Sequence, residues 1–250
     1  MASDLHVVAL AGMPEVAAGA DLAALIVEAA ARARRAIEDG DVFVVAQKIV
    51  SKAEGAVVCL DDVEPSARAI EWGAANAKDP RVIEVVLRES ARIVRMERGV
   101  LIAETRHGFV CANAGVDASN VERGFVTLLP RDPDASAVRL RDALATAFDR
   151  NVAVIVSDTF GRPWREGVVN VALGVAGLRP LADYRGCRDT YGRELTSTVL
   201  AIADEIASAA ELVMRKTARL PVAIVSGAAD WIGSGRGADL VRDAARDLFR

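Results

Sequence analysis

Short apolar runs alternate with longer amphipathic stretches along most of the 250 residues. Uninterrupted apolar runs are typical of buried strands. The strands predicted in this way cover 6–10, 42–46, 152–158 and 221–227. Apolar residues spaced three and four apart are typical of helices with one buried face. The helices predicted from that spacing cover 19–41, 65–78, 80–93, 132–148 and 237–249, and 194–214 is either a long helix or a strand leading into one.

Residues that favour helix ends mark several of these boundaries. The first helix is expected to end near Gly40. Pro65 and Pro80 open the next two helices, since proline is best tolerated in the first turn. Asp134 or Ser136 is the expected cap of the helix over 132–148.

The middle of the chain has a different pattern. The segments 93–99, 100–108 and 109–115 are short, β-branched and separated by glycine, which predicts antiparallel hairpins. We therefore expect a mixed α/β (α+β) fold in which 1–250 forms a single unit. Its two lobes would be an α/β lobe from 1–90 with 190–250 and a β-rich insertion over 91–189.

Composition and charge argue against several function classes. The net charge is −4 and no basic block stands out, so neither nucleic-acid nor anionic-membrane binding is expected. No apolar run approaches the roughly 18–20 residues of a membrane span, and the first residues lack the basic start of a signal peptide. Three scattered cysteines and two histidines do not favour a disulfide framework, a zinc site or a Ser-His-Asp hydrolase. We expect a reduced, cytoplasmic protein.

Two lysines follow the predicted strand at 42–46. In "QKIVSKAEGAVV" (47–58), predicted as a loop, Lys48, Ser51 and Lys52 can place two ammonium groups and a hydroxyl at a phosphate. The alternative, favoured on this segment alone, is a solvated loop. The G-x-x-x-x-G-K-[ST] phosphate loop occurs nowhere in the chain.

A second polar segment, "CANAGVDASNVERG" (111–124), carries Asp117 and Asn120 among small residues. A carboxylate and a carboxamide on such a loop suit a cation such as Mg²⁺ or Mn²⁺, or a nucleotide. The alternative is an Asx turn, in which these side chains bind their own backbone.

A third polar segment, "SDTFGRPWREG", ends the strand predicted at 152–158. Ligands of α/β sheets bind where strands end, so Asp158 and Thr159 are candidate metal ligands. Arg162 and Arg165 are three apart, and a helical turn would place both on one face toward phosphate or a substrate carboxylate. The alternative is a salt bridge between Asp158 and an arginine that supports the turn.

The fourth segment, 183–194, is a charged loop that contains Arg188 and Glu194. It either clamps a polar ligand or forms a surface that faces a second subunit. Together, the four segments combine carboxylates, hydroxyls and lysines. That combination favours metal-assisted phosphate chemistry over covalent acyl-enzyme chemistry.

Five motifs occur in one order along the chain: "VVAQKIVSKAEG", "NAGVDASNV", "SDTFGRPWREG", "DYRGCRDTYGRELTSTVLAIADEIASAAELV" and "PVAIVSG". In that combination, the sequence closely resembles the coenzyme F-420-0:L-glutamate ligase family, the gamma-glutamyl ligases of deazaflavin cofactor biosynthesis. The resemblance runs from about residue 7 to about residue 248.

The resemblance implies a reaction and its components. A ligase of this family uses GTP to join L-glutamate to the carboxylate of the deazaflavin precursor F-420-0 through an acyl phosphate, releasing GDP and phosphate, and adds further gamma-linked glutamates. Two divalent cations, Mg²⁺ or Mn²⁺, and the monovalent K⁺ are the implied cofactors. The implied fold is two-lobed and forms an interlocked homodimer with the nucleotide in a groove at the interface.

The resemblance also implies roles for individual residues. The catalytic residues it implies are Asp117, Asp158 and Lys52. The implied nucleotide contacts are Met13, Pro14, Glu15, Val16, Gln47, Lys52 and Asn120, and the implied metal ligands are Asp117, Asp158 and Thr159. Proximity and charge alone make substrate-binding candidates of Arg162, Arg165, Arg188 and Glu194.

The sequence departs from the family pattern at two positions. Gln47 stands where many members have serine or threonine, and Val199 stands where some relatives carry a polar residue. These departures leave open a ligase for a different small carboxylate acceptor. A non-catalytic nucleotide- or deazaflavin-binding protein is the other alternative.

Overall fold

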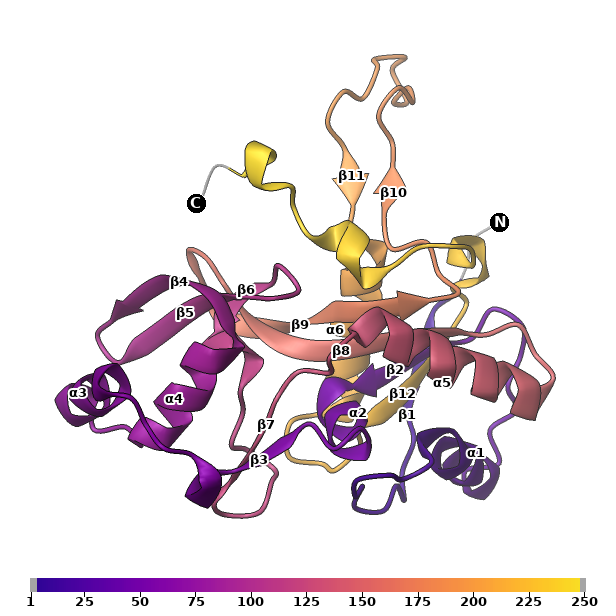
Figure 1. Cartoon of the computed structure of the whole chain (residues 1–250). Coiled ribbons are helices and arrows are strands. Elements are labelled where there is room, and N and C mark those ends of the chain that lie inside the picture. The colour runs from indigo at the N-terminus through magenta and orange to yellow at the C-terminus, as the bar shows by residue number, and fades with distance from the viewer. Residues whose placement is uncertain (1–3, 248–250) are drawn as a thin grey trace.

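The computed structural model describes residues 4–247, and a five-stranded sheet of order β1-β12-β2-β8-β9 lies at its centre (Figure 1). The strands are β1 (His6–Ala9), β2 (Val42–Ala46), β8 (Ala153–Arg162), β9 (Arg165–Ala176) and β12 (Val222–Ser226). β2 and β8 are parallel, and the other neighbouring pairs are antiparallel. The four strands predicted from uninterrupted apolar runs are confirmed, with β9 added to them.

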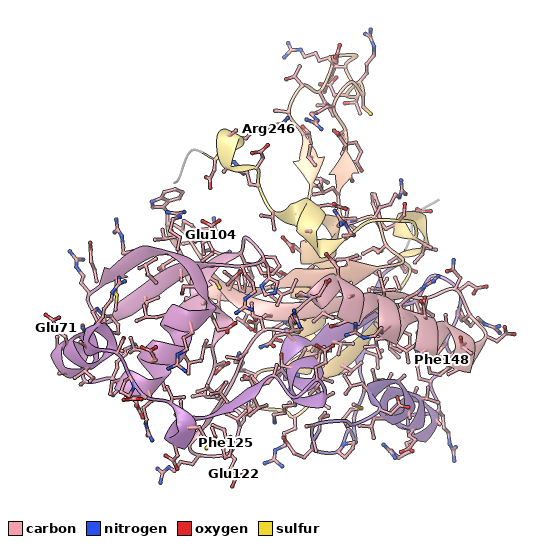
Figure 2. The ribbon with its side chains drawn as sticks, viewed as in Figure 1. Glu71, Glu104, Glu122, Phe125, Phe148 and Arg246 are labelled. Carbon is pink, nitrogen blue, oxygen red and sulfur yellow. The ribbon has the colours of Figure 1, made fainter. Side chains whose placement is uncertain are left out.

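Side chains of this sheet alternate between two buried faces. The helices that cover these faces are α1 (Leu22–Arg32), α5 (Pro133–Phe148) and α6 (Ile202–Met214). Phe43 and Val154 lie on the face covered by α1 and α5. Phe43 stacks there on Phe148, which lies at the end of α5 (Figure 2). Val44 and Ile155 lie on the opposite face, which α6 covers. Because both faces are covered, the central strands are apolar at every position rather than at every second one.

A second hydrophobic core lies beside the sheet, at the left of Figure 1. Its elements are α3 (Ala67–Asn76), α4 (Pro80–Glu89), the sheet β4 (Ser90–Glu97), β5 (Val100–Thr105) and β6 (Val110–Ala112), and the pair β3 (Val57–Cys59) with β7 (Phe125–Thr127). Ile83 and Val86 of α4 lie in one core with Leu101 of β5. The antiparallel pairing confirms the hairpins predicted over 93–115.

The two cores divide the chain differently from the predicted lobes. β8 and β9, inside the range 91–189, belong to the main sheet beside β2. α3 and α4, inside the range 1–90, share the second core, which uses residues between 58 and 128. The boundaries at 91 and 189 are therefore corrected. Local patterns identify a strand but not its partner, which long-range pairing decides.

Several predicted helix ends are also corrected. α1 ends at Arg32 rather than near Gly40. α4 ends at Glu89, and β4 begins at Ser90, inside the helix predicted over 80–93. Asp132, rather than Asp134 or Ser136, caps α5 by accepting a hydrogen bond from the backbone N–H of Ala135. The segment predicted as a loop over 47–58 begins with α2 (Gln47–Ala53), which at seven residues is too short to establish a period.

The closing helix predicted over 237–249 is wrong. The chain forms only the short 3₁₀ turns η4 (Gly237–Leu240) and η5 (Ala244–Arg246), and positions 248 and 249 lie outside the described residues. η4 is held by Asp134, whose carboxylate accepts from the N–H groups of Gly237 at 2.6 Å and Val175 at 2.9 Å. Because the N–H of Gly237 donates to the Asp134 side chain, this hydrogen bond competes with the backbone hydrogen bonds of a helix.

A long arm projects from the sheet at the top of Figure 1. Its base is the pair β10 (Ala182–Asp183) and β11 (Val199–Leu200), and the charged segment 184–198 lies beyond it. β11 leads directly into α6, so the segment 194–214 is a strand followed by a helix, one of the two forms predicted. None of the helices in 4–247 is long and apolar enough to cross a membrane.

Candidate functional site

A cleft of about 700 Å³ opens where β2 ends, beside the middle of β8. Ala46, the last residue of β2, pairs with Ser157 of β8, so the residues that follow both lie at the same edge. This is where α/β sheets bind ligands. The residues singled out from the sequence that line the cleft are Met13, Pro14, Glu15, Val16, Gln47, Lys48, Lys52, Asn120, Asp158 and Thr159.

α2 points two lysines along one side of the cleft, because positions four apart share a helix face. The Lys52 ammonium donates to the Asn120 carbonyl oxygen at 2.8 Å and forms an ion pair with Glu15. Lys48 donates to Asp117 Oδ2 at 2.8 Å and to the Ser119 carbonyl oxygen at 2.7 Å. α2 therefore connects the early loop to the loop after β6. The plain solvated-loop interpretation of this segment is wrong, since both lysine side chains are largely covered.

Asp117 is held in a defined orientation beside the cleft. Its backbone pairs with Thr127, and its Oδ1 accepts from the Ser119 N–H at 2.6 Å, which is the Asx turn considered as an alternative. The same carboxylate also binds Lys48, so the turn does not exclude a role in the site. Burial raises the pKa of Asp117, but hydrogen bonds from Lys48 and Ser119 outweigh burial and leave the pKa below its ordinary value.

The pKa of Asp158 is shifted in the opposite direction. Burial first, and then the negative charge of nearby Asp117, raise this pKa to about 6. A hydrogen bond from the Thr159 N–H and the charges of Lys216 and Lys48 lower it, but not enough to offset burial. Among the ion pairs of residues 4–247, Asp158 is paired with no arginine, so the salt-bridge alternative is wrong. Asp117, beside the cleft, is near enough for its charge to act on Asp158 in the cleft.

A chain of polar contacts continues from Thr159 across the sheet. The Thr159 hydroxyl donates to Asn170 Oδ1 at 2.9 Å, and Asn170 Nδ2 donates to Glu211 Oε2 of α6 at 3.2 Å. Lys216 lies 3.4 Å from the Thr159 hydroxyl. Sequence reasoning missed Asn170, Glu211 and Lys216, although an asparagine inside the apolar run of β9 was a visible sign.

The arginines are placed elsewhere. Arg162 and Arg165 face each other across the turn of the β8–β9 hairpin, so the expectation of a helical turn is wrong. Arg162 donates to the Glu166 carbonyl oxygen at 2.7 Å. Arg188 and Glu194 form a backbone bridge within the arm. None of these four residues lines the cleft in the chain as described.

The donors at the carboxylate end fit a hard divalent cation. Among residues 4–247, no three His, Cys, Asp or Glu side chains form a ligand group. Mg²⁺ commonly keeps several waters and takes only one or two protein carboxylates together with substrate phosphates. The raised pKa of Asp158, caused by burial and then by Asp117, indicates uncompensated negative charge that a cation would relieve. Asp117 and Asp158 therefore fit a metal, with Thr159 beside them.

An α/β sheet with a cleft at its strand ends, two covered lysines and a close carboxylate pair places the chain among enzymes rather than structural proteins. Comparison with known proteins makes this specific. The model of the F420-0:Gamma-glutamyl ligase family matches residues 12–227, and the chain belongs to that family.

Three relatives are similar over nearly their whole length. The chain is 48% identical over 241 residues to the Coenzyme F420:L-glutamate ligase of Methanopyrus kandleri, covering 94% of each chain. It is 45% identical to the protein of the same name from Methanothermobacter thermautotrophicus, covering 98% of this chain and 99% of the other. It is 40% identical to that from Archaeoglobus fulgidus, covering 96% of this chain and 94% of the other. The chain is therefore a ligase that forms amide bonds.

Proposed function

We propose that the enzyme uses GTP to join L-glutamate to the carboxylate of the deazaflavin precursor F-420-0, and then adds further gamma-linked glutamates. The single observation that carries this proposal is a cleft lined by Lys48, Lys52 and Asp158, with Asp117 bound to Lys48 beside it, within a member of this ligase family. The relatives supply the substrate class, since their names specify coenzyme F420 and L-glutamate.

The proposed reaction has two steps. A carboxylate oxygen of the acceptor attacks the γ-phosphorus of GTP, the bond to the β-phosphate oxygen breaks, and GDP leaves with its electron pair. The amine nitrogen of L-glutamate then attacks the acyl carbon, the carbon–oxygen bond to phosphate breaks, and the amide loses a proton. Phosphate and a glutamylated product result.

The chain's residues have distinct tasks in this scheme. Lys52, fixed by Asn120, contacts the nucleotide phosphates, while Met13, Pro14 and Val16 line the nucleotide side of the cleft. Gln47 is held by Ser51 and presents its amide in the same cleft. Asp117 and Asp158 would hold Mg²⁺ or Mn²⁺, and Thr159 would be a ligand of a second cation. Divalent cations neutralise charge that develops on the phosphoryl group.

The three reactants that meet in the cleft are all anionic. Two unit charges about 4 Å apart repel by roughly 4 kcal/mol at an intermediate dielectric. Lys48, Lys52 and bound cations offset that repulsion and stabilise the transferring phosphoryl group. The arrangement suits phosphoryl transfer and not a covalent acyl-enzyme.

We also propose that the enzyme is a homodimer. The arm projects from the body of the chain (Figure 1) and carries Tyr191 at 90% exposure, and Trp164 at the turn of the β8–β9 hairpin is 80% exposed. Leu212 on α6 is 77% exposed. Large exposed apolar side chains on projecting elements are typical of association surfaces. Light scattering after size exclusion tests this, and a monomeric mass at micromolar concentration would contradict it.

The function is tested by incubating the enzyme with GTP, Mn²⁺, L-glutamate and the precursor. The expected result is products heavier by whole glutamyl residues, with stoichiometric GDP. Parallel reactions contain ATP, or alternative small carboxylate acceptors. Equal turnover with ATP would contradict the nucleotide assignment, and GTP turnover only with another acceptor would redirect the substrate. Neither GTP turnover nor glutamylation would refute the proposal.

A further inference from the structure

A second, smaller cavity of about 500 Å³ opens beside the main cleft. The two cavities share Thr159, Asn170, Glu211 and Lys216, so they are continuous at these residues. The smaller cavity is completed by Val168 and Val169 of β9. It therefore adjoins the proposed metal ligands.

Glu211, like Asp158, differs from the two paired carboxylates of the site. Glu15 is paired with Lys52, and Asp117 with Lys48. Among the ion pairs of residues 4–247, Glu211 has no lysine or arginine partner. Lys216 lines the same cavity, but its ammonium lies 3.4 Å from the Thr159 hydroxyl rather than in an ion pair with Glu211. A partly covered carboxylate that has no ion-pair partner at the wall of a cavity is a binding position for a cationic group.

A chain of hydrogen bonds through Asn170 fixes the position of Glu211. Asn170 is 5% exposed and donates its Nδ2 to Glu211 Oε2, while its Oδ1 accepts from Thr159, the neighbour of Asp158. The Ser208 hydroxyl donates to the Asn170 carbonyl oxygen at 2.8 Å, which ties β9 to α6. Glu211 is thus held two hydrogen bonds away from Thr159, with Oε1 left for another partner.

We infer that Glu211 holds the ammonium group of the incoming amino acid in the smaller cavity and orients it toward the acyl phosphate. This inference rests on the proposed function and adds to it the binding position of the amine substrate. The ammonium group first gives one proton to Glu211, which frees the nitrogen lone pair to attack the acyl carbon. As the carbon–oxygen bond breaks, phosphate leaves with the electron pair of that bond and takes up the second proton that the nitrogen loses when the amide forms.

The experiment compares Glu211→Gln with the wild type in two reactions of the full enzyme. The first measures glutamylated product at varied L-glutamate and varied GTP. The second omits L-glutamate and traps the acyl phosphate with hydroxylamine as a hydroxamate. Glu205→Gln is the matched control, because Glu205 is an exposed residue of the same helix that lines neither cavity.

In Glu211→Gln, we expect the KM for L-glutamate to rise about tenfold or more, as for a lost charge-assisted hydrogen bond. The KM for GTP and the rate of hydroxamate formation should stay within about twofold of the wild type, because hydroxylamine needs no ammonium site. Glu211→Asp should recover part of the lost affinity. Glu205→Gln should match the wild type in both reactions.

Two results would overturn the inference while leaving the proposed function intact. One is an unchanged KM for L-glutamate in Glu211→Gln. The other is an equal loss of hydroxamate and glutamylated product together with weaker Mn²⁺ binding, measured by electron paramagnetic resonance, which would make Glu211 part of the metal site. If the wild type forms neither product, the proposed function itself fails.

Discussion

Replacing Asp158 by asparagine should make the protein more stable while it abolishes activity. The pKa of Asp158 is raised from 3.8 to about 6, by burial first and then by the charge of Asp117. At about 1.4 kcal/mol for each tenfold change in proton affinity, keeping this carboxylate ionised costs the folded state about 3 kcal/mol. Asparagine has nearly the same volume and no charge, so it removes that cost.

The pH dependence of this effect follows from the sign of the pKa change. Between pH 4 and pH 6, the folded chain binds more protons at Asp158 than the unfolded chain, so stability falls as pH rises through that window. The cost is fully present above pH 6 and absent below pH 4. The gain in Asp158→Asn should therefore be about 3 kcal/mol at pH 8 and about half as large at pH 5.

The assay is urea unfolding of both proteins at pH 8 and pH 5 in the presence of a chelator, which removes any stabilisation by bound metal. Asp117→Asn is the matched control with the opposite sign. Its pKa lies below the ordinary value, because Lys48 and Ser119 outweigh burial, so that variant should lose stability at pH 8. A loss of stability in Asp158→Asn at pH 8, or a gain that is equal at both pH values, would refute the reasoning.

Three further predictions address other parts of the molecule. Cys187 is exposed, whereas burial and then the charge of Asp158 raise the pKa of Cys111 to about 12. Alkylation of the native protein at pH 8 should therefore modify Cys187 and leave Cys111 intact, as measured by peptide mass spectrometry. In steady-state kinetics, Lys52→Met should raise the KM for GTP about tenfold or more and leave the KM for L-glutamate unchanged. Lys78→Met is the control outside the cleft. An equal rise of both KM values in Lys52→Met would contradict the phosphate contact. Gly174→Ala should lower the free energy of unfolding by about 1–3 kcal/mol in a urea titration, because the added Cβ would lie 2.0 Å from the carbonyl oxygen of Pro133, the first residue of α5. An unchanged free energy of unfolding would show that α5 can shift to make room.

The cysteine prediction also depends on the pair of carboxylates. Cys111 lies in β6, and the charge that contributes to its raised pKa belongs to Asp158 in β8. A strand beside the second core therefore comes close to Asp158 of the main sheet. The candidate site lies where the two cores meet, and both are needed to build it.

The apolar pattern by itself determined four of the five strands of the main sheet, all but β9. The uninterrupted runs at 42–46 and 152–158 predicted β2 and the first half of β8, since strands covered on both faces need apolar residues at every position. The motifs around Asp117 and Asp158 also identified the two acidic residues of the candidate site. Both results come from local patterns, which depend on neighbours only a few residues apart.

Tertiary structure alone decided which of these residues meet. Lys48 reaches Asp117 across 69 positions of sequence, and Asn170 reaches Glu211 across 41. No periodicity encodes such contacts, because they depend on strand pairing and on how α2 and α6 pack against the sheet. For the same reason the arginines near Asp158 were misplaced: β8 continues past Asp158 into a hairpin, and its pairing with β9 carries Arg162 away from the cleft.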